Sequence, residues 1–431
     1  MLDVKAVREN PEQFRKALAR RGMAEAVDEL LELDERRREL TARVEQLRAE
    51  QNRASKAIGK AQGDERTKLI GEVAKVSAEI ERLAPELEEA EKRLGDALAR
   101  VPNLPDESAP DGFTEDDAVE VRRRGEPPEF GFEPRDHVAL GELLGVLDIE
   151  RAARTSGSRF VYLLGDIVHV QFALVRHALD ILTARGFQPV IPPVLVREEA
   201  MFGTGFLPTD AVNIYVTRED DLYLVGTSEV SLAAFHMGEI LDESVLPVRM
   251  AGYSTCFRRE AGSYGKDLGG MFRVHQFDKV EMFSFTRPED SRDEHEFLVG
   301  IEEEIVGNLE LPYRVVNVAA GDLGGAAAKK YDIEVWLPGQ ARYRELTSCS
   351  NCTDYQARRL QTRVRRGEGD IEVLHTLNGT ATAIGRTLIA ILENRQRRDG
   401  SVELPKALFP YLPESVRVLA PKDPPKDPTA N

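Results

Sequence analysis

Two arginines and a carboxylate stand directly before a glycine-rich stretch near the middle of this 431-residue chain. Arg258 and Arg259 precede Glu260, and the run 274–281 beyond the glycines alternates with a period of two, which predicts a strand. We expect two antiparallel strands joined by a long loop, with charged side chains on one face. Burying such charges is costly unless a ligand pairs with them. Because a guanidinium suits phosphate and an aromatic ring suits a base, the segment predicts a ligand that carries both. The charged face holds His275, Phe277, Lys279 and Glu281.

A second segment, His375–Gln396, begins as a polar strand end and continues as an apolar helix. Its apolar residues Ile384, Leu388 and Ile391 recur at helical spacing. Arg386 lies near the start of this helix, so we expect its side chain to project into the space outlined by the first segment.

Together the two segments resemble motifs 2 and 3 of the class II aminoacyl-tRNA synthetases. Three shorter sequences resemble the seryl-tRNA synthetases in particular: TSE at 227–229, HQFDKVE at 275–281 and HTLNG at 375–379. The opening sequence, MLDVKAVRENPEQFRKAL, resembles the start of the bacterial type of this family. The resemblance covers nearly the whole chain. It implies a serine–tRNA ligase, which forms seryl adenylate from L-serine and Mg-ATP and passes the seryl group to the 3′ end of tRNA(Ser). Family analogy extends to tRNA(Sec), although nothing in the sequence shows that the host has one.

The resemblance also implies roles in ATP binding. Amino-acid activation needs no protein nucleophile, because positioning and electrostatics suffice. Arg258 is expected to clamp the α-phosphate and Glu260 to take the adenine amino group, while Phe277 and Arg386 stack on opposite faces of adenine. Glu345 and Ser348 are expected to hold Mg²⁺, and Arg258, Arg386 and Glu345 to be catalytic. The expected ATP-binding set is Arg258, Arg259, Glu260, Val274, Phe277, Glu345, Leu346, Thr347, Ser348 and Arg386.

A serine pocket is implied in the same way. Glu281 and Thr380 are expected to hydrogen-bond the substrate hydroxyl and its surroundings. A site built to pair a hydroxyl rejects alanine, because its own polar groups would be left unpaired. The family commonly has serine where Thr380 stands, so this pocket carries one extra methyl group. Thr227 could also cap the helix that follows it, and the two roles can coexist. The expected serine-binding set is Thr227, Ser228, Glu229, Arg258, Glu281 and Thr380.

The chain holds three cysteines, and Cys349 and Cys352 form a C-x-x-C sequence that could be half of a zinc site. A tetrahedral site would need two more ligands, such as Cys256 with a histidine. The resemblance is to the branch of the family whose pocket holds no zinc, so we expect Mg²⁺ with ATP and no zinc.

The first hundred residues carry a heptad repeat in two runs, 30–58 and 69–101. The short connection between them predicts an antiparallel helical hairpin, with each helix roughly 45 Å long or more. Pro85 conflicts with this interpretation, because proline kinks a helix or removes a hydrogen bond. We keep the helix because the heptad phase continues across it.

Charge is distributed unevenly along this hairpin. Residues 48–75 hold seven basic and four acidic residues, whereas residues 79–96 hold three basic and seven acidic residues. Periodicity alone is typical of a generic coiled coil for dimerisation or spacing. The basic tip and the family resemblance favour an arm that binds tRNA, even though the chain has a net charge of −17. The expected tRNA contacts are Arg53, Lys56, Lys60 and Lys68.

Four parts are expected along the chain. They are an N-terminal tRNA-binding helical domain (1–105), a linker (106–135), a class II catalytic domain (136–418) and a disordered tail (419–431). Helices and strands alternate irregularly in the catalytic part, with no Rossmann fingerprint, which predicts an α+β fold with an antiparallel sheet.

Composition and one further motif bear on location and assembly. The charged N-terminus has no signal-peptide core, no apolar run is long enough to span a bilayer, and sparse cysteines suit a reducing cytoplasm. The sequence GFQPVIPPVLV resembles motif 1 with Pro192 at a subunit interface, which implies a homodimer, although proline is also tolerated in a plain edge strand.

Two rival functions were weighed. A paralogue that charges a carrier protein would lack the long arm and would rely on zinc. A non-enzymatic coiled-coil scaffold that binds RNA would not need the charged residues of the two motifs. Serine-dependent ATP–pyrophosphate exchange separates them.

Overall fold

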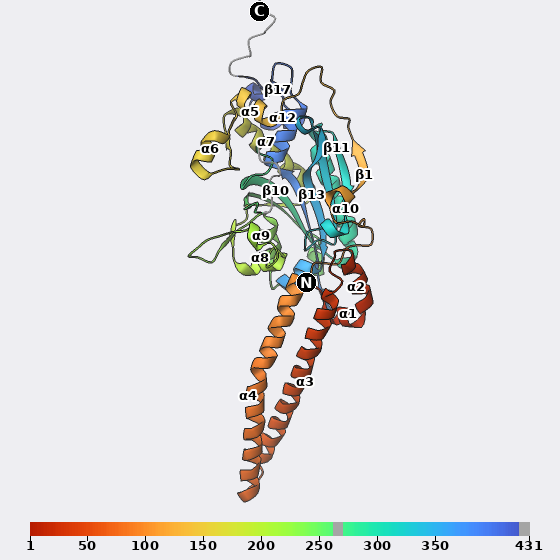
Figure 1. Cartoon of the computed structure of the whole chain (residues 1–431), viewed down its shortest axis with the longest axis vertical. Helices are drawn as coiled ribbons and strands as arrows, with labels where there is room; N and C mark the ends of the chain where they lie inside the picture. The colour runs from red at the N-terminus through yellow and green to blue at the C-terminus, as the bar shows by residue number, and fades with distance from the viewer. Residues whose placement is uncertain (262–269, 422–431) are drawn as a thin grey trace, which may run out of the picture. The chain divides into compact units, whose positions relative to one another are not determined.

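The computed structural model describes residues 1–261 and 270–421 (Figure 1). The chain forms two compact units, Met1–Leu104 and Pro105–Asn431.

The first unit is helical. Two short helices are followed by two long ones that lie side by side as an antiparallel hairpin (Figure 1). The helices are α1 (Val4–Glu9), α2 (Pro11–Ala19), α3 (Ala26–Ile58) and α4 (Gly63–Arg100). Heptad positions of both long helices meet in a buried seam: Leu40, Val44, Leu47, Leu83 and Ala90. The predicted hairpin is confirmed, and α4 continues through Pro85 as one helix.

The second unit is built on an eight-stranded sheet in the order β1-β11-β12-β13-β16-β10-β9-β4. All neighbours are antiparallel except β4 and β9, so the predicted α+β fold with an antiparallel sheet is confirmed. The strands are β1 (Val119–Arg124), β4 (Gln188–Val190), β9 (Val248–Phe257), β10 (Gln276–Thr286), β11 (Tyr313–Asn317), β12 (Lys329–Leu337), β13 (Arg342–Thr353) and β16 (His375–Ala383).

Strands β9 and β10 are the predicted antiparallel pair, with Gln276 opposite Phe257. The predicted glycine-rich connection between them falls partly on residues 262–269, which lie outside the described residues. Alternation along β10 sorts its side chains as expected. Val280 and Met282 enter the main hydrophobic core, whereas Lys279 and Glu281 line a pocket.

Helices α7 (Asp166–Ala184), α10 (Ser291–Asn308) and α12 (Ile384–Asn394) contribute to the core built on this sheet. The predicted apolar helix after the second motif is therefore α12, with Arg386 in its first turn. Among the described residues, α7 is the one helix long and apolar enough to cross a membrane by composition. Its buried residues pack in the core of the sheet domain, as in the core helices of many globular folds.

Shorter elements complete the second unit. The helices are α5 (His137–Leu144), α6 (Ile149–Ser156), α8 (Glu198–Thr204), α9 (Glu229–Ala233) and α11 (Tyr355–Leu360). The strands are β2 (Leu147–Asp148), β3 (Tyr162–Leu163), β5 (Leu195–Val196), β6 (Tyr215–Val216), β7 (Tyr223–Leu224), β8 (Ile240–Asp242), β14 (Arg363–Arg365), β15 (Ile371–Val373), β17 (Val402–Glu403) and β18 (Val418–Leu419).

The segment expected to be a linker, 106–135, contains β1, which pairs with β11 at the edge of the large sheet. Its VEVRRR sequence is a short run with the charges that edge strands tolerate. At the other end, β18 pairs with β17 across the boundary expected at residue 419. Residues 422–431 of the expected tail lie outside the described residues.

Candidate active site

A cavity of about 620 Å³ opens in the sheet unit and is lined by residues of β10, β12, β13, β16 and α12 and by the loops around them. It brings together most of the residues expected to bind ATP and serine. These are Thr227, Glu229, Arg258, Glu260, Val274, Phe277, Glu281, Glu345, Leu346, Thr347, Ser348, Thr380 and Arg386. Of the described residues that were expected here, Arg259 and Ser228 lie outside the lining. Ser228 is buried beneath it, and its hydroxyl donates to the carbonyl of Gly252 (3.4 Å).

Two arginines supply positive charge to this cavity. The Arg258 Nε donates to the carbonyl of Gly226 (3.1 Å), and its guanidinium lies 5.2 Å from the ring centre of Phe277. Arg386 Nη1 donates to the backbone carbonyl of Glu345 (3.0 Å) and lies 3.3 Å from its carboxylate. Both side chains are therefore held in place by neutral or acidic partners and face the cavity.

The Arg386 guanidinium also lies 4.7 Å from the ring centre of Phe272, and that of Arg344 lies 4.1 Å from the same centre. Phe272 lines the cavity and was not among the predicted residues. It lies outside the alternating run 274–281 that gave the prediction, so no periodic signal in the sequence marked it.

Glu345 is the acidic group at this end of the cavity. Its side chain is 45% exposed. Partial burial opposes ionisation, but Arg386 and Lys330 outweigh it and lower the pKa of Glu345 to about 2. Lys330 also lines the cavity and pairs with Asp332 (3.2 Å). Burial raises the pKa of Asp332 to about 7, although Lys330 acts to lower it. Lys330 was not among the predicted residues, although alternation along KKYDIEVW places it on the face of Asp332.

Glu260, three residues after the end of β9, has a positive φ of 52°, which is uncommon for a residue with a side chain. Its carboxylate lies 3.2 Å from Arg273 Nη1. Two contacts between Arg258 and His275 close the base of the connection, one from the Arg258 N–H to the His275 carbonyl (3.0 Å) and one between His275 Nδ1 and the Arg258 carbonyl (2.8 Å). The strained conformation thus sits on a fixed base, as strained residues at functional sites do.

The other end of the cavity is lined by two carboxylates, the buried Glu281 and the half-buried Glu229. Glu281 is 1% exposed, and its Oε2 contacts both Lys279 Nζ and the Thr380 hydroxyl, the latter at 3.5 Å. Burial raises the pKa of Glu281 to about 7, and Glu229 adds to this effect while Lys279 opposes it. Lys279 lines the cavity but was not assigned a role from the sequence.

Glu229 Oε1 accepts hydrogen bonds from Gln356 Nε2 (2.8 Å) and Asn378 Nδ2 (3.0 Å). Burial raises the pKa of Glu229, and the bond from Gln356 acts in the opposite direction. The Thr227 hydroxyl accepts from the Glu229 N–H (3.2 Å), so it binds a free N–H at the start of α9, although Ser228 occupies the cap position. These bonds fix the direction in which Glu229 faces the cavity.

The three cysteines are buried thiols. Burial raises the pKa values of the Cys349 and Cys352 thiols well above their ordinary value. Cys352 Sγ lies 3.5 Å from Asn378 Nδ2, where it accepts a hydrogen bond. Within residues 1–261 and 270–421, no three His, Cys, Asp or Glu side chains are grouped so that they could hold a metal ion.

The four basic residues expected to contact tRNA are exposed in the first unit. Arg53 and Lys56 lie in the last two turns of α3, Lys60 follows that helix, and Lys68 lies in the second turn of α4. They therefore lie on either side of the turn that joins the two long helices.

Comparisons with known proteins agree with this arrangement. A family model described as the seryl-tRNA synthetase N-terminal domain matches residues 1–105, and one described as the tRNA synthetase class II core domain (G, H, P, S and T) matches residues 213–395. The serine–tRNA ligase of Acidothermus cellulolyticus is 51% identical over 98% of this chain and 100% of its own length.

Two solved structures are also similar. The seryl-tRNA synthetase of Pyrococcus horikoshii complexed with ATP superposes with a TM-score of 0.93 at 43% identity, over 98% of this chain and 100% of that one. The cytoplasmic serine–tRNA ligase of Naegleria fowleri in complex with AMP has a TM-score of 0.87 at 37% identity, over 98% and 99% of the two chains. The expectation drawn from the two motifs is confirmed: the chain belongs to the seryl-tRNA synthetases, the serine–tRNA ligases of class II.

Proposed function

We propose that this cavity is where the chain joins L-serine to ATP, with the two substrates bound at opposite ends. The observation that carries the proposal is the separation of charge within one cavity. Arg386, Lys330 and the ionised Glu345 lie together at one end, whereas the half-buried Glu229 and the buried Glu281, which pairs with Lys279, lie at the other. Phosphates suit the first environment, and an amino acid with an ammonium and a hydroxyl suits the second.

At the nucleotide end, Arg258 would bind the α-phosphate and neutralise the charge that develops there, since preorganised cations are most effective where charge develops. Phe277 and Arg386 would stack on the adenine ring, and Glu260 would accept from its amino group. Val274, Leu346 and Thr347 lie in the same lining. Arg259, outside the lining, would act only through its neighbours.

At the serine end, Glu229 and Thr227 would bind the ammonium group, and Glu281 with Thr380 would bind the hydroxyl. Support comes from the contact that Glu281 Oε2 already makes with the Thr380 hydroxyl (3.5 Å). Ser228 would support this wall from below. Alanine lacks the hydroxyl, so the hydrogen bond between substrate and Glu281 would be lost inside a buried polar pocket.

Glu345 and Ser348 fit a magnesium ion that arrives with ATP. Both line the cavity, both offer oxygen, and the lowered pKa of Glu345 keeps its carboxylate ionised at neutral pH. The ion would neutralise phosphate charge when bound. Burial raises the pKa values of the Cys349 and Cys352 thiols, whereas zinc binds thiolates, so we propose that this C-x-x-C holds no zinc.

The long hairpin would bind the tRNA substrate through its exposed basic residues Arg53, Lys56, Lys60 and Lys68. We assign residues 1–105 to this function, residues 136–418 to catalysis, and residues 106–135 and 419–431 to the connection and the tail. Charging of tRNA(Sec) by the same arm would require only that this tRNA share the contacts of tRNA(Ser).

We infer a homodimer formed through the motif 1 region near Pro192. Strand β4 ends the large sheet, and the next residue, Ile191, is 85% exposed although it is apolar. An exposed apolar side chain at a sheet edge is typical of a contact between subunits. We place the enzyme in the cytoplasm, away from membranes, because three sparse cysteines suit a reducing compartment.

Serine-dependent ATP–pyrophosphate exchange tests the proposal directly. The purified chain is expected to exchange pyrophosphate with serine but only weakly with alanine, by a factor of about 10⁴ if the unpaired-hydroxyl argument holds. Exchange without amino acid, or equal exchange with alanine, would contradict the assignment of the two carboxylates. Charging of a carrier protein in place of tRNA would favour the rival paralogue.

A further inference from the structure

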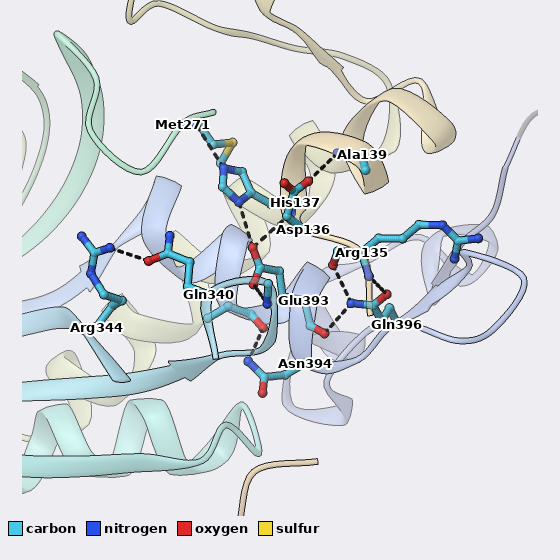
Figure 2. Close-up of polar contacts among 12 residues, drawn as sticks. Arg135, Asp136, His137, Ala139, Met271, Gln340, Arg344, Glu393, Asn394 and Gln396 are labelled. Carbon is cyan, nitrogen blue, oxygen red and sulfur yellow. Dashed lines mark hydrogen bonds and ion pairs between the residues drawn. The ribbon is translucent and has the colours of Figure 1, made fainter. Parts of the chain in front are cut away.

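The start of α5 is fastened to the end of α12 by buried polar contacts (Figure 2). Glu393 on α12 is fully buried, and its Oε1 accepts from the backbone N–H of His137 (3.1 Å) and lies 2.9 Å from His137 Nδ1. Its Oε2 accepts from the N–H of Gly339 (2.9 Å). Gln396 exchanges two hydrogen bonds with the backbone of Arg135, both 2.8 Å long. Residues 135–137 are thereby tied to the helix that carries Arg386.

The other nitrogen of this histidine points toward the nucleotide end of the cavity. His137 Nε2 accepts a hydrogen bond from the backbone N–H of Met271 (3.2 Å). A neutral imidazole has one donor and one acceptor, so the proton must lie on Nδ1, where it is donated to Glu393. The two contacts thus specify one tautomer, and the ring joins α12 to the segment that leads into β10.

That segment is shaped to receive the ring. Gly270 has a positive φ of 76°, and a Cβ atom there would lie 2.1 Å from His137 Nε2. The next two residues, Met271 and Phe272, are buried and line the cavity. Because Gly270 lacks a side chain, the backbone can approach the histidine closely enough to form the bond.

These contacts form a closed circuit of residues. Arg386, at the start of α12, stacks on Phe272 (4.7 Å), and Phe272 follows Met271 in the chain. Met271 donates to His137, which donates to Glu393 at the end of the same helix. The helix that presents Arg386 therefore also holds, through His137, the aromatic ring on which Arg386 rests.

We propose that His137 is a positioning residue for ATP: by holding the Met271 N–H it keeps Phe272 beneath Arg386 and presets the nucleotide end of the cavity. This rests on the proposed function, since it takes ATP to bind at that end. No residue at the serine end takes part in this circuit of contacts, so a substitution of His137 should change ATP binding and not serine binding.

Two substitutions separate the two hydrogen bonds of the His137 side chain, one to Glu393 and one from Met271. In His137→Asn the short amide can still donate to Glu393 from the place of Nδ1, but it cannot reach Met271. In His137→Gln the amide oxygen takes the place of Nε2 and can accept from Met271, while the bond to Glu393 is lost. The asparagine variant should raise the KM for ATP in pyrophosphate exchange about 3- to 10-fold, as expected for one lost hydrogen bond, with the KM for serine unchanged. The glutamine variant should stay within about twofold of the wild type for both substrates.

A third variant reaches the same bond from the other side. Gly270→Ala should push Met271 away from His137 and raise the KM for ATP in the same way, so the inference can be tested even if a His137 variant does not fold. His177→Gln is the matched control. His177 is also a buried histidine, but its side chain faces Tyr411 in the core, and its replacement should lower the melting temperature without separating the two KM values.

The inference stands if the KM for ATP rises selectively in His137→Asn and Gly270→Ala and is restored in His137→Gln. It is overturned if the glutamine variant is as impaired as the asparagine variant, if the KM for serine rises in parallel, or if neither variant changes the KM for ATP. An inactive wild-type enzyme would instead overturn the proposed function, so the two failures are distinguishable.

Discussion

Lys279 and Glu281 form a buried ion pair on the same face of β10, two residues apart, and the Thr380 hydroxyl contacts the same carboxylate oxygen from β16. Burial nevertheless raises the pKa of Glu281 to about 7, with Glu229 reinforcing it and Lys279 opposing it. The Glu281 carboxyl group, which faces the cavity, therefore has a pKa near neutral pH. Its ionisation should be visible in both stability and substrate binding.

The first prediction concerns stability and pH. Because the folded pKa of Glu281 lies above its ordinary value of 4.5, its contribution to stability is fully present below pH 4.5 and is lost as pH rises through about 7. Relative to wild type, Glu281→Gln should therefore gain roughly 2 kcal/mol in free energy of unfolding between about pH 5.5 and pH 8. Thermal melting of both proteins across this range measures the difference. A pH-independent difference would show that Glu281 does not titrate near neutrality.

The second prediction concerns Lys279. Lys279→Met removes the cation that opposes burial, so the pKa of Glu281 should rise further and the hydroxyl acceptor should be protonated at neutral pH. The KM for serine is expected to rise by at least about tenfold, because the hydrogen bond from the substrate hydroxyl to a charged carboxylate is lost, while the KM for ATP changes little. The KM for serine should fall again as the pH is raised above neutrality. A parallel rise in both constants would point to a general loss of structure instead.

The third prediction concerns Arg258, whose guanidinium faces the cavity and is held there through Nε by the Gly226 carbonyl (3.1 Å). Arg258→Ala should lower serine-dependent pyrophosphate exchange by at least about 100-fold, because a cation aimed at developing charge is lost. The melting temperature should change little, since the side chain is not part of the hydrophobic core. Arg154→Ala is the control, because Arg154 is an exposed surface arginine on α6. Near-normal exchange in Arg258→Ala would remove this residue from the reaction.

The fourth prediction separates the two units. Replacing residues 33–98 with a short linker should leave serine activation within a few-fold of wild type and abolish aminoacylation of tRNA. Every residue that lines the cavity lies in the second unit, Pro105–Asn431, whereas the expected tRNA contacts lie in the first. Pyrophosphate exchange and tRNA charging are measured on the same preparation. Equal loss of both activities would contradict an arm devoted to tRNA.

Periodicity in the sequence predicts the faces of elements but not the neighbours of those elements. Alternation in 274–281 correctly places Lys279 and Glu281 on one face of β10, and the heptads correctly predict α3 and α4. Lys330 was missed because the pairing of β12 with β13, which sets it opposite Ser350, brings it to the cavity, and no local pattern encodes that pairing.

The contact between His137 and Glu393 was missed for the same reason. The two residues are separated by 256 positions, and a lone histidine in a chain with seven gives no signal by itself. Strand β1 was hidden in a segment rich in proline, glycine and charge, because an edge strand needs few apolar residues. What could be predicted rested on local period and on long motifs, and what could not depended on contacts made across the sheet.

The fifth prediction concerns the basic residues at the end of the hairpin. Neutralising Arg53, Lys56, Lys60 and Lys68 together should weaken tRNA binding and flatten its dependence on salt, because each lost phosphate contact removes the release of a counterion. If all four contact phosphate, the slope of log affinity against log salt should fall by roughly 3. Serine and ATP should bind as before.

A matched control removes the same number of positive charges from another part of the hairpin. Arg36, Arg38, Lys92 and Arg93 are also exposed on α3 and α4 but lie far along both helices from the turn. If net charge alone attracted tRNA, the two quadruple variants would flatten the salt dependence equally, and a generic coiled coil would explain the hairpin. If the end of the hairpin binds tRNA, only the first variant should change the slope, because only there do the lost cations face phosphate.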